Sequence, residues 1–184
     1  YDCKKKRYYS EGDLEEYFSS LQKESKWKSY IGLTFYRTNL VNSQTEVICA
    51  IAEAFEKEGL KVIPAFGYPD YLVLEKIFLK IPVKIEALLS LSLKVGIKPE
   101  KVLSPLEKLN VPLFNLVIPF EKDFESYKKD GTGLGILERA WQVFIPELIG
   151  AIGPMVVGFK RKITLNDKGE LYYVEEPYPY GIER

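Results

Sequence analysis

The positions of apolar and polar residues predict strands that alternate with helices over most of the chain. Residues 31–35 form a short apolar run of the kind that a buried parallel strand needs, and a polar stretch at 36–42 follows as a loop. Residues 47–55 repeat apolar side chains at helical spacing, between a Ser-Gln-Thr-Glu capping box at 43–46 and Gly59, the expected left-handed end of the helix. Residues 60–66 are the second strand, so we expect a right-handed βαβ unit.

Short apolar runs, typical of buried strands, and apolar residues at helical spacing continue to alternate along the rest of the chain. They predict a leader helix within residues 8–23, further helices at 71–80, 99–110 and 121–129, and strands at 85–91, 113–118 and 141–145. Two strand-like runs at 155–165 and 170–175 flank an Asn-Asp-Lys-Gly turn signal. The expected fold class is α/β: a mostly parallel open sheet of about five strands with flanking helices, flavodoxin-like or similar to one lobe of a periplasmic binding protein, plus a C-terminal antiparallel hairpin.

These elements divide the chain into three expected parts. They are a leader helix and connector at 1–29, an α/β domain at 30–154, and a hairpin extension with a linker at 155–184. The chain does not begin with methionine, and residues 177–181 (Pro-Tyr-Pro-Tyr-Gly) have the composition of a connector. We therefore expect a piece of a longer protein.

Composition narrows the classes of partner. With 46% hydrophobic residues and 26 basic against 26 acidic side chains, the 184-residue chain is globular and has no overall charge to attract nucleic acid or an anionic membrane. It has no apolar run of membrane-spanning length and no signal-peptide pattern, so a soluble protein is expected. Cys3 and Cys49 are too few for a disulfide framework; Cys49 is expected as a buried free thiol, which fits a reducing cytoplasm.

The sequence lacks the residues and motifs that usually bind ATP or a catalytic metal ion. Histidine is absent, and no Gly-Lys-Ser/Thr phosphate loop occurs; Gly131, Gly133 and Gly135 are expected in a plain flexible loop. The segment alone should therefore neither hydrolyse ATP nor insert a metal, and it should bind no cofactor of its own.

Three motifs, taken in order, resemble a known family. They are Gly32-Leu33-x-Phe35-Tyr36-Arg37, Leu106-x-x-Leu109-Asn110-Val111-Pro112 and Pro146-Glu147-x-x-Gly150-x-Ile152-Gly153-Pro154. The arrangement over residues 8–184 is similar to the N-terminal part of the domain shared by the large subunits of ATP-dependent chelatases, which are the cobaltochelatase CobN type and the magnesium chelatase H subunit. Residues 88–94 and 148–149 depart from the pattern of many relatives, which leaves the metal and the ring open.

The resemblance implies a function for the longer protein. Large subunits of this type bind a tetrapyrrole while Co²⁺ or Mg²⁺, the metal substrate, is inserted, and partner AAA+ motor subunits use the ATP. Cobalt insertion, as in cobalamin biosynthesis, is the first expectation and magnesium insertion the second. The other expected partner is the remainder of the same large subunit.

The candidate site residues lie in loops that follow the strands. The carboxyl ends of parallel strands share one edge, so residues 36–42, 67–70, 90–96 and 119–122 should converge there. The substrate-binding candidates are Tyr36, Arg37, Thr38, Asn39 and Tyr68, with Arg37 exposed and the turn at 146–150 nearby. Glu147 is a candidate base for removing a pyrrole proton.

Each candidate has a structural alternative. Arg37 could pair with a ring carboxylate or make a salt bridge to a neighbouring loop. Tyr36, Tyr68 and Tyr71 could stack on a ring, although aromatic residues at strand ends more often close a core. Glu147 could instead cap the amides of its own turn. A small-molecule receptor lobe without chemistry and a purely architectural domain are the rival functions.

Overall fold

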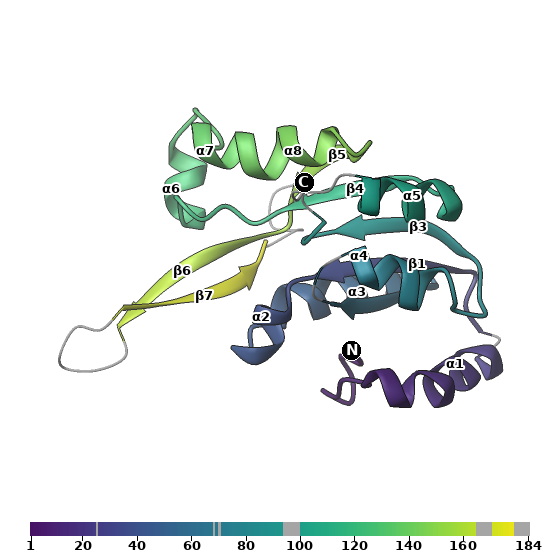
Figure 1. Cartoon of the computed structure of the whole chain (residues 1–184). Coiled ribbons are helices and arrows are strands. Elements are labelled where there is room, and N and C mark those ends of the chain that lie inside the picture. The colour runs from purple at the N-terminus through teal and green to yellow at the C-terminus, as the bar shows by residue number, and fades with distance from the viewer. Residues whose placement is uncertain (25, 68, 70, 94–99, 165–170, 179–184) are drawn as a thin grey trace.

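Five parallel strands form the centre of the molecule. The computed structural model describes residues 1–184 except 25, 68, 70, 94–99, 165–170 and 179–184. Its strands are β1 (Ser29–Phe35), β2 (Leu60–Phe66), β3 (Ile85–Ser90), β4 (Leu113–Val117) and β5 (Ile152–Val156). Their spatial order is β2-β1-β3-β4-β5, with every neighbouring pair parallel. This doubly wound arrangement confirms the predicted fold class (Figure 1).

Helices precede and connect the strands. They are η1 (Glu11–Asp13), α1 (Leu14–Lys23), α2 (Arg37–Val41), α3 (Glu46–Lys57), α4 (Tyr71–Val73), the π-helical η2 (Leu74–Phe78), α5 (Glu100–Leu109), α6 (Phe124–Lys129), α7 (Ile136–Arg139), the π-helical η3 (Ala140–Phe144) and α8 (Ile145–Glu147). None of those that the structure describes has both the length and the apolar character needed to cross a lipid bilayer.

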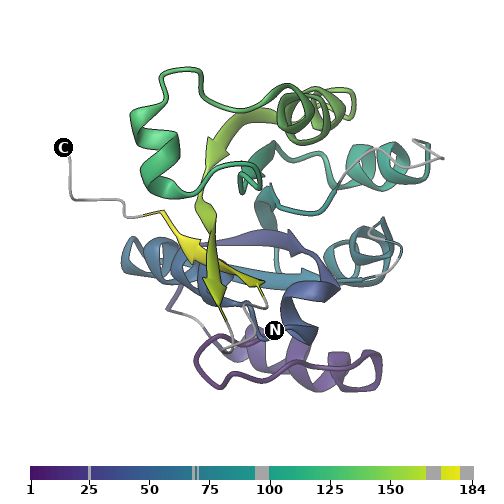
Figure 2. The ribbon, with the colours of Figure 1, turned by 90° about the vertical axis from the view of Figure 1, so that its left-hand side faces the viewer.

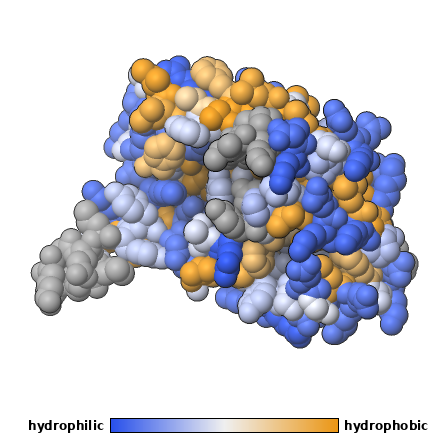
Figure 3. All heavy atoms as spheres, viewed as in Figure 1, coloured by the Kyte–Doolittle hydropathy of each residue, from blue (hydrophilic) through white to orange (hydrophobic). Residues whose placement is uncertain are grey.

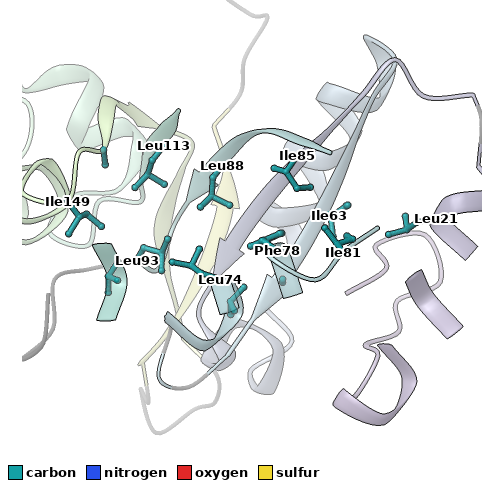
Figure 4. Packing of buried hydrophobic residues seen from close by; sticks show 14 residues of the cluster. Leu21, Ile63, Leu74, Phe78, Ile81, Ile85, Leu88, Leu93, Leu113 and Ile149 are labelled. Atoms are coloured by element: carbon teal, nitrogen blue, oxygen red, sulfur yellow. The ribbon is translucent and has the colours of Figure 1, made fainter. Parts of the chain in front are cut away.

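The two faces of the sheet bury separate apolar clusters. On one face, Leu21 of α1, Phe78 of η2 and Leu88 of β3 belong to a cluster that reaches Ile149 after α8 (Figure 4). On the other face, α3 packs Val47, Ile48 and Ala52 against β1. Figure 2 shows the sheet between these layers. Helices on both faces explain why the strands are mostly apolar.

Gly32 allows η2, which carries Phe78, to approach the sheet closely. A Cβ at this position would lie 2.7 Å from Leu88 Cδ1 and 2.9 Å from Phe78 Cε1. Any side chain larger than hydrogen would therefore push η2 away from the middle of β1.

The first βαβ unit agrees with the sequence except at the start of its helix. Gly59 adopts φ +84°, as expected for a left-handed end. The capping box is wrong: Ser43 lies outside the helix at φ 54°, and Thr45 precedes α3 without a side-chain cap. The predicted 36–42 loop is also wrong in part, because α2 occupies most of it and displaces the start of α3.

The predicted strand at 141–145 is wrong. These residues belong to one continuous helical stretch made by α7, η3 and α8, and the fifth strand is β5 instead. The local run Trp-Gln-Val-Phe-Ile has the aromatic and β-branched content of a strand. Over a longer window the apolar residues recur at helical spacing, at Leu137, Trp141, Phe144 and Leu148. The structure follows this longer pattern.

A two-stranded antiparallel hairpin follows the sheet, as predicted. β6 (Gly158–Thr164) pairs with β7 (Leu171–Pro177), while Met155 and Val156, which we expected in this hairpin, belong to β5. The turn predicted at 166–169 lies outside the described residues. Figure 1 shows the hairpin projecting away from the sheet. Its base packs against α6, where the rings of Phe124 and Phe159 have centroids 5.5 Å apart.

Cys49 is not a free thiol, so this expectation is wrong. Cys3 and Cys49 form a disulfide, with their Cα atoms 5.4 Å apart. The N-terminal segment returns to the face of α3, where a bridge pairs Asp2 with Arg7 and Lys4 Nζ lies 2.6 Å from Glu56 Oε2. No local pattern brings residues 46 positions apart together.

Candidate functional site

The carboxyl edge of the sheet has a topological switch point between β1 and β3. The chain leaves β1 through α3 on one face and leaves β3 through α5 on the other face. Connections that diverge in this way leave a crevice outside the strand ends, where open α/β sheets bind ligands. The predicted convergence of loops at this edge is confirmed for the strands β1, β3 and β4.

A cleft of about 280 Å³ lies at this switch point. Its walls combine aromatic rings with hydrogen-bonding and charged groups, and they come from the ends of β1, β3 and β4, from η3 and from the hairpin. The lining residues are Tyr36, Thr38, Asn39, Leu91, Ile118, Phe120, Trp141, Gln142, Lys160 and Glu175. Such a mixture of flat apolar surface and a few polar groups is typical of small-molecule sites.

Helix α2 separates this cleft from a larger groove of about 570 Å³. Thr38 and Asn39 line the cleft, whereas Arg37, Leu40 and Val41 line the groove on the other side of the helix. The groove runs between the N-terminal segment, α1, the end of β2 and α4; its lining includes Tyr8, Tyr9, Tyr17, Phe66, Leu72 and Lys76. The short helix thus presents residues of one sequence stretch to two hollows.

The most unusual polar group of the cleft is Glu175. Its Oε2 accepts a hydrogen bond of 2.6 Å from Asn39 Nδ2, which joins β7 to α2. Burial raises the pKa of the Glu175 carboxyl above its ordinary value; the charge of Lys160 and the bond from Asn39 oppose this shift, and Glu46 adds to it. Raised carboxyl pKa values in clefts mark candidates for proton transfer or ligand binding.

Glu175→Gln should stabilise the protein at pH 8 and have little effect at pH 4. Because folding raises its pKa, Glu175 contributes stability that is fully present below its unfolded pKa of about 4.5 and is lost as pH rises through the higher folded pKa. Glutamine can still accept the bond from Asn39 but carries no charge. Urea unfolding at the two pH values measures this. Glu176→Gln, next to it and hydrogen-bonded to Arg161, is the control and should show no gain at pH 8.

Gln142 fixes the wall of the cleft beside β4. Its side-chain amide forms two bonds with the backbone of Ile118: Nε2 donates to the carbonyl at 3.0 Å, and Oε1 accepts from the N–H at 3.2 Å. The backbone carbonyl of Gln142 accepts from Asn115 Nδ2 at 2.5 Å, while the buried Asn115 Oδ1 has no partner within the described residues. The π-helical turn therefore makes contacts with β4 through both its side chain and its backbone.

Glu138 holds the loop that follows β4. Its carboxylate is fully buried and accepts three backbone N–H groups, from Phe120 at 2.5 Å, Glu121 at 2.9 Å and Gly135 at 3.0 Å. Because Phe120 lines the cleft, this buried carboxylate determines the shape of one wall.

The structure brings some of the predicted site residues together and separates others. Tyr36, Thr38 and Asn39 line the cleft, while Arg37 is exposed, as expected, and lines the groove. Tyr68 lies outside the described residues.

The expected position of the 146–150 turn is wrong. It precedes β5, so it lies at the amino edge of the sheet, where Ile149 and Gly150 border a hollow with Leu113. Glu147 is exposed at that edge, away from the cleft. Tyr71 packs against a buried cluster, in agreement with the core alternative.

Sequence reasoning missed the part of the cleft that η3 and the hairpin form. Glu175 and Lys160 reach it only because the hairpin passes beside α2, and no local signal indicates that. Gln142 and Trp141 were hidden by the incorrect strand at 141–145; the helical spacing of Leu137, Trp141 and Phe144 could have revealed them.

Comparisons with known proteins agree with this architecture. The chain is 32% identical over 177 residues to an uncharacterised protein of Methanocaldococcus jannaschii, an alignment that covers 85% of this chain and 14% of that protein. It is 30% identical over 147 residues to the magnesium-chelatase H subunit of Cereibacter sphaeroides, covering 74% of this chain and 12% of the relative. The chain thus spans a small part of the length of these relatives.

A solved structure shares the fold. The catalytic subunit of cobaltochelatase from Mycobacterium tuberculosis superposes with a TM-score of 0.61 at 22% identity, over 84% of this chain and 14% of that one. The family described as CobN/Magnesium Chelatase matches residues 2–184, almost the entire chain. The chain therefore belongs to the CobN/magnesium chelatase family and is a segment of its large subunit.

Proposed function

We propose that this segment helps to hold the tetrapyrrole substrate of an ATP-dependent metal chelatase. The observation that carries the proposal is the cleft at the switch point, with Tyr36, Phe120 and Trp141 as flat surfaces around Asn39 and Glu175. At about 280 Å³ the cleft is at the lower end of ligand pockets, so it suits one edge of a macrocycle rather than the whole ring. The ring would extend over α2 toward Arg37.

In this proposal, metal insertion requires the longer protein, and ATP hydrolysis is carried out by its partner subunits. We infer cobalt insertion, as in cobalamin biosynthesis, as the first candidate reaction and magnesium insertion as the second. The metal ion is a substrate, and AAA+ partner subunits would hydrolyse the ATP. A complex that uses ATP in this way is expected in the cytoplasm.

Tryptophan fluorescence tests whether the cleft binds a ring. Trp141 lines the cleft, whereas Trp27 lies elsewhere, near the ammonium groups of Lys4, Lys26 and Lys61. Titration with a free-base corrinoid or porphyrin should quench emission in Trp27→Phe, which keeps Trp141, and much less in Trp141→Phe. Equal quenching in both variants, or none in either, would contradict the proposed site. The ring that binds more tightly would favour one of the two reactions.

Arg37→Ala should weaken binding of the same ring without unfolding the chain. An exposed guanidinium can pair with a carboxylate on the rim of the ring, and a hydrogen bond to a charged group contributes about 1.5–3 kcal/mol, roughly 10- to 150-fold in Kd. The same titration gives Kd, and urea unfolding checks the fold. Unchanged affinity would assign Arg37 to the salt-bridge alternative.

A further inference from the structure

One row of apolar side chains on the helical stretch α7–η3–α8 is exposed. Leu137, Trp141, Phe144 and Leu148 follow one another at intervals of four, three and four residues along it, and Trp141 also lines the cleft. They are all more than half exposed, up to 74% for Leu148. Ile152 and Met155 of β5 are both 52% exposed. We call these six residues the apolar stripe; Figure 3 shows apolar atoms gathered over α7, α8 and β5.

Two polar residues of this helical stretch, Glu138 and Gln142, face the body of the protein. The fully buried Glu138 accepts three backbone N–H groups there, and the side chain of Gln142 pairs with the backbone of Ile118. This differs from the usual arrangement, in which a surface helix buries its apolar face and exposes its polar side chains. The buried polar contacts fix the rotation of the helix, so the apolar side chains cannot turn inward.

Strand β5 extends the stripe but is poorly suited to sheet extension. Among the described residues it pairs with β4 alone, which leaves its other edge open. Pro154 in the middle of β5 has no N–H to donate, a feature that protects edge strands from further pairing. The surface is therefore suited to side-chain packing by a partner that lies across the helix and the strand.

The relatives are much longer than this segment. The aligned parts make up only 14% and 12% of the two relatives, and 14% of the solved cobaltochelatase subunit, so most of such a polypeptide lies outside the segment. We propose that the apolar stripe is an intramolecular docking face, covered by an apolar element of the same large-subunit polypeptide outside these 184 residues. Contiguous exposed apolar surface of this kind marks interaction sites in soluble proteins. The proposal depends on family membership and not on tetrapyrrole binding.

Site-specific photocrosslinking tests the proposal in the large-subunit polypeptide that carries this segment. Benzoylphenylalanine replaces Phe144 in one variant and, as a matched control, the partly exposed Leu79 after η2 in another. We expect Phe144 to crosslink within one polypeptide, to a peptide outside the segment, with at least five times the yield found at Leu79. Crosslinks from Phe144 to a second copy or to a separate protein, or a yield equal to that of the control, would overturn the proposal.

A charge substitution provides an independent measurement. Leu148→Glu should leave the urea midpoint of the 184-residue segment nearly unchanged, since the side chain is exposed there. In the longer polypeptide, Leu148→Glu would bury a charge in the docked face and so weaken docking. Protease should therefore cleave within the segment at least ten times faster in this variant than in the unsubstituted polypeptide. Equal cleavage of the two long polypeptides would contradict docking at the stripe.

Discussion

Replacing Cys3 by serine is expected to lower the free energy of unfolding by about 4 kcal/mol. The disulfide joins residues 46 positions apart, and loop-closure entropy for a loop of this length predicts a loss of about this size. The link attaches the N-terminal segment to α3, and that segment supplies Tyr8 and Tyr9 to the wall of the larger groove. The variant should therefore lose stability and also lose the shape of this wall.

Urea unfolding with and without a reductant measures this loss. The unsubstituted chain in reductant should unfold at the same midpoint as Cys3→Ser, and the variant itself should not respond to reductant. Cys49→Ser should behave like Cys3→Ser, since each removes the same link. A midpoint that reductant leaves unchanged in the unsubstituted chain would show that the disulfide is not formed or does not stabilise the fold.

Glu138→Ala is expected to cost about 3 kcal/mol and to distort the cleft. The substitution leaves the N–H groups of Phe120, Glu121 and Gly135 without their acceptor, and each unsatisfied buried donor costs about 1 kcal/mol or more. The loop after β4 would then lose the position that places Phe120 in the wall of the cleft. Stability and ring binding should therefore decrease together.

The control for this prediction is another glutamate of the same helical stretch. Glu147→Ala removes an exposed carboxylate at the amino edge of the sheet and should change the free energy of unfolding by less than about 0.5 kcal/mol. The emission of Trp141 reports on the cleft in both variants. If Glu138→Ala is as stable as Glu147→Ala, the buried carboxylate does not hold the loop.

The sequence by itself determined the class of the sheet and the order of its first four strands. The apolar runs at 31–35 and 60–66, the helical spacing of Val47, Ile48 and Ala52, and the left-handed Gly59 all depend on interactions within a few residues or on burial of a whole face. Such local signals also placed Tyr36, Thr38 and Asn39 at the carboxyl edge, because parallel strands have only one such edge.

Only the tertiary structure decided which distant groups meet. The disulfide of Cys3 with Cys49 and the bond of Asn39 with Glu175 join residues 46 and 136 positions apart. Trp141 is helical because apolar residues recur around it at helical spacing and because Glu138 makes buried contacts with the loop after β4. Together these outweigh the local preference for a strand. Pairings of this kind follow from how the chain folds back on itself, and periodicity along the sequence carries no information about them.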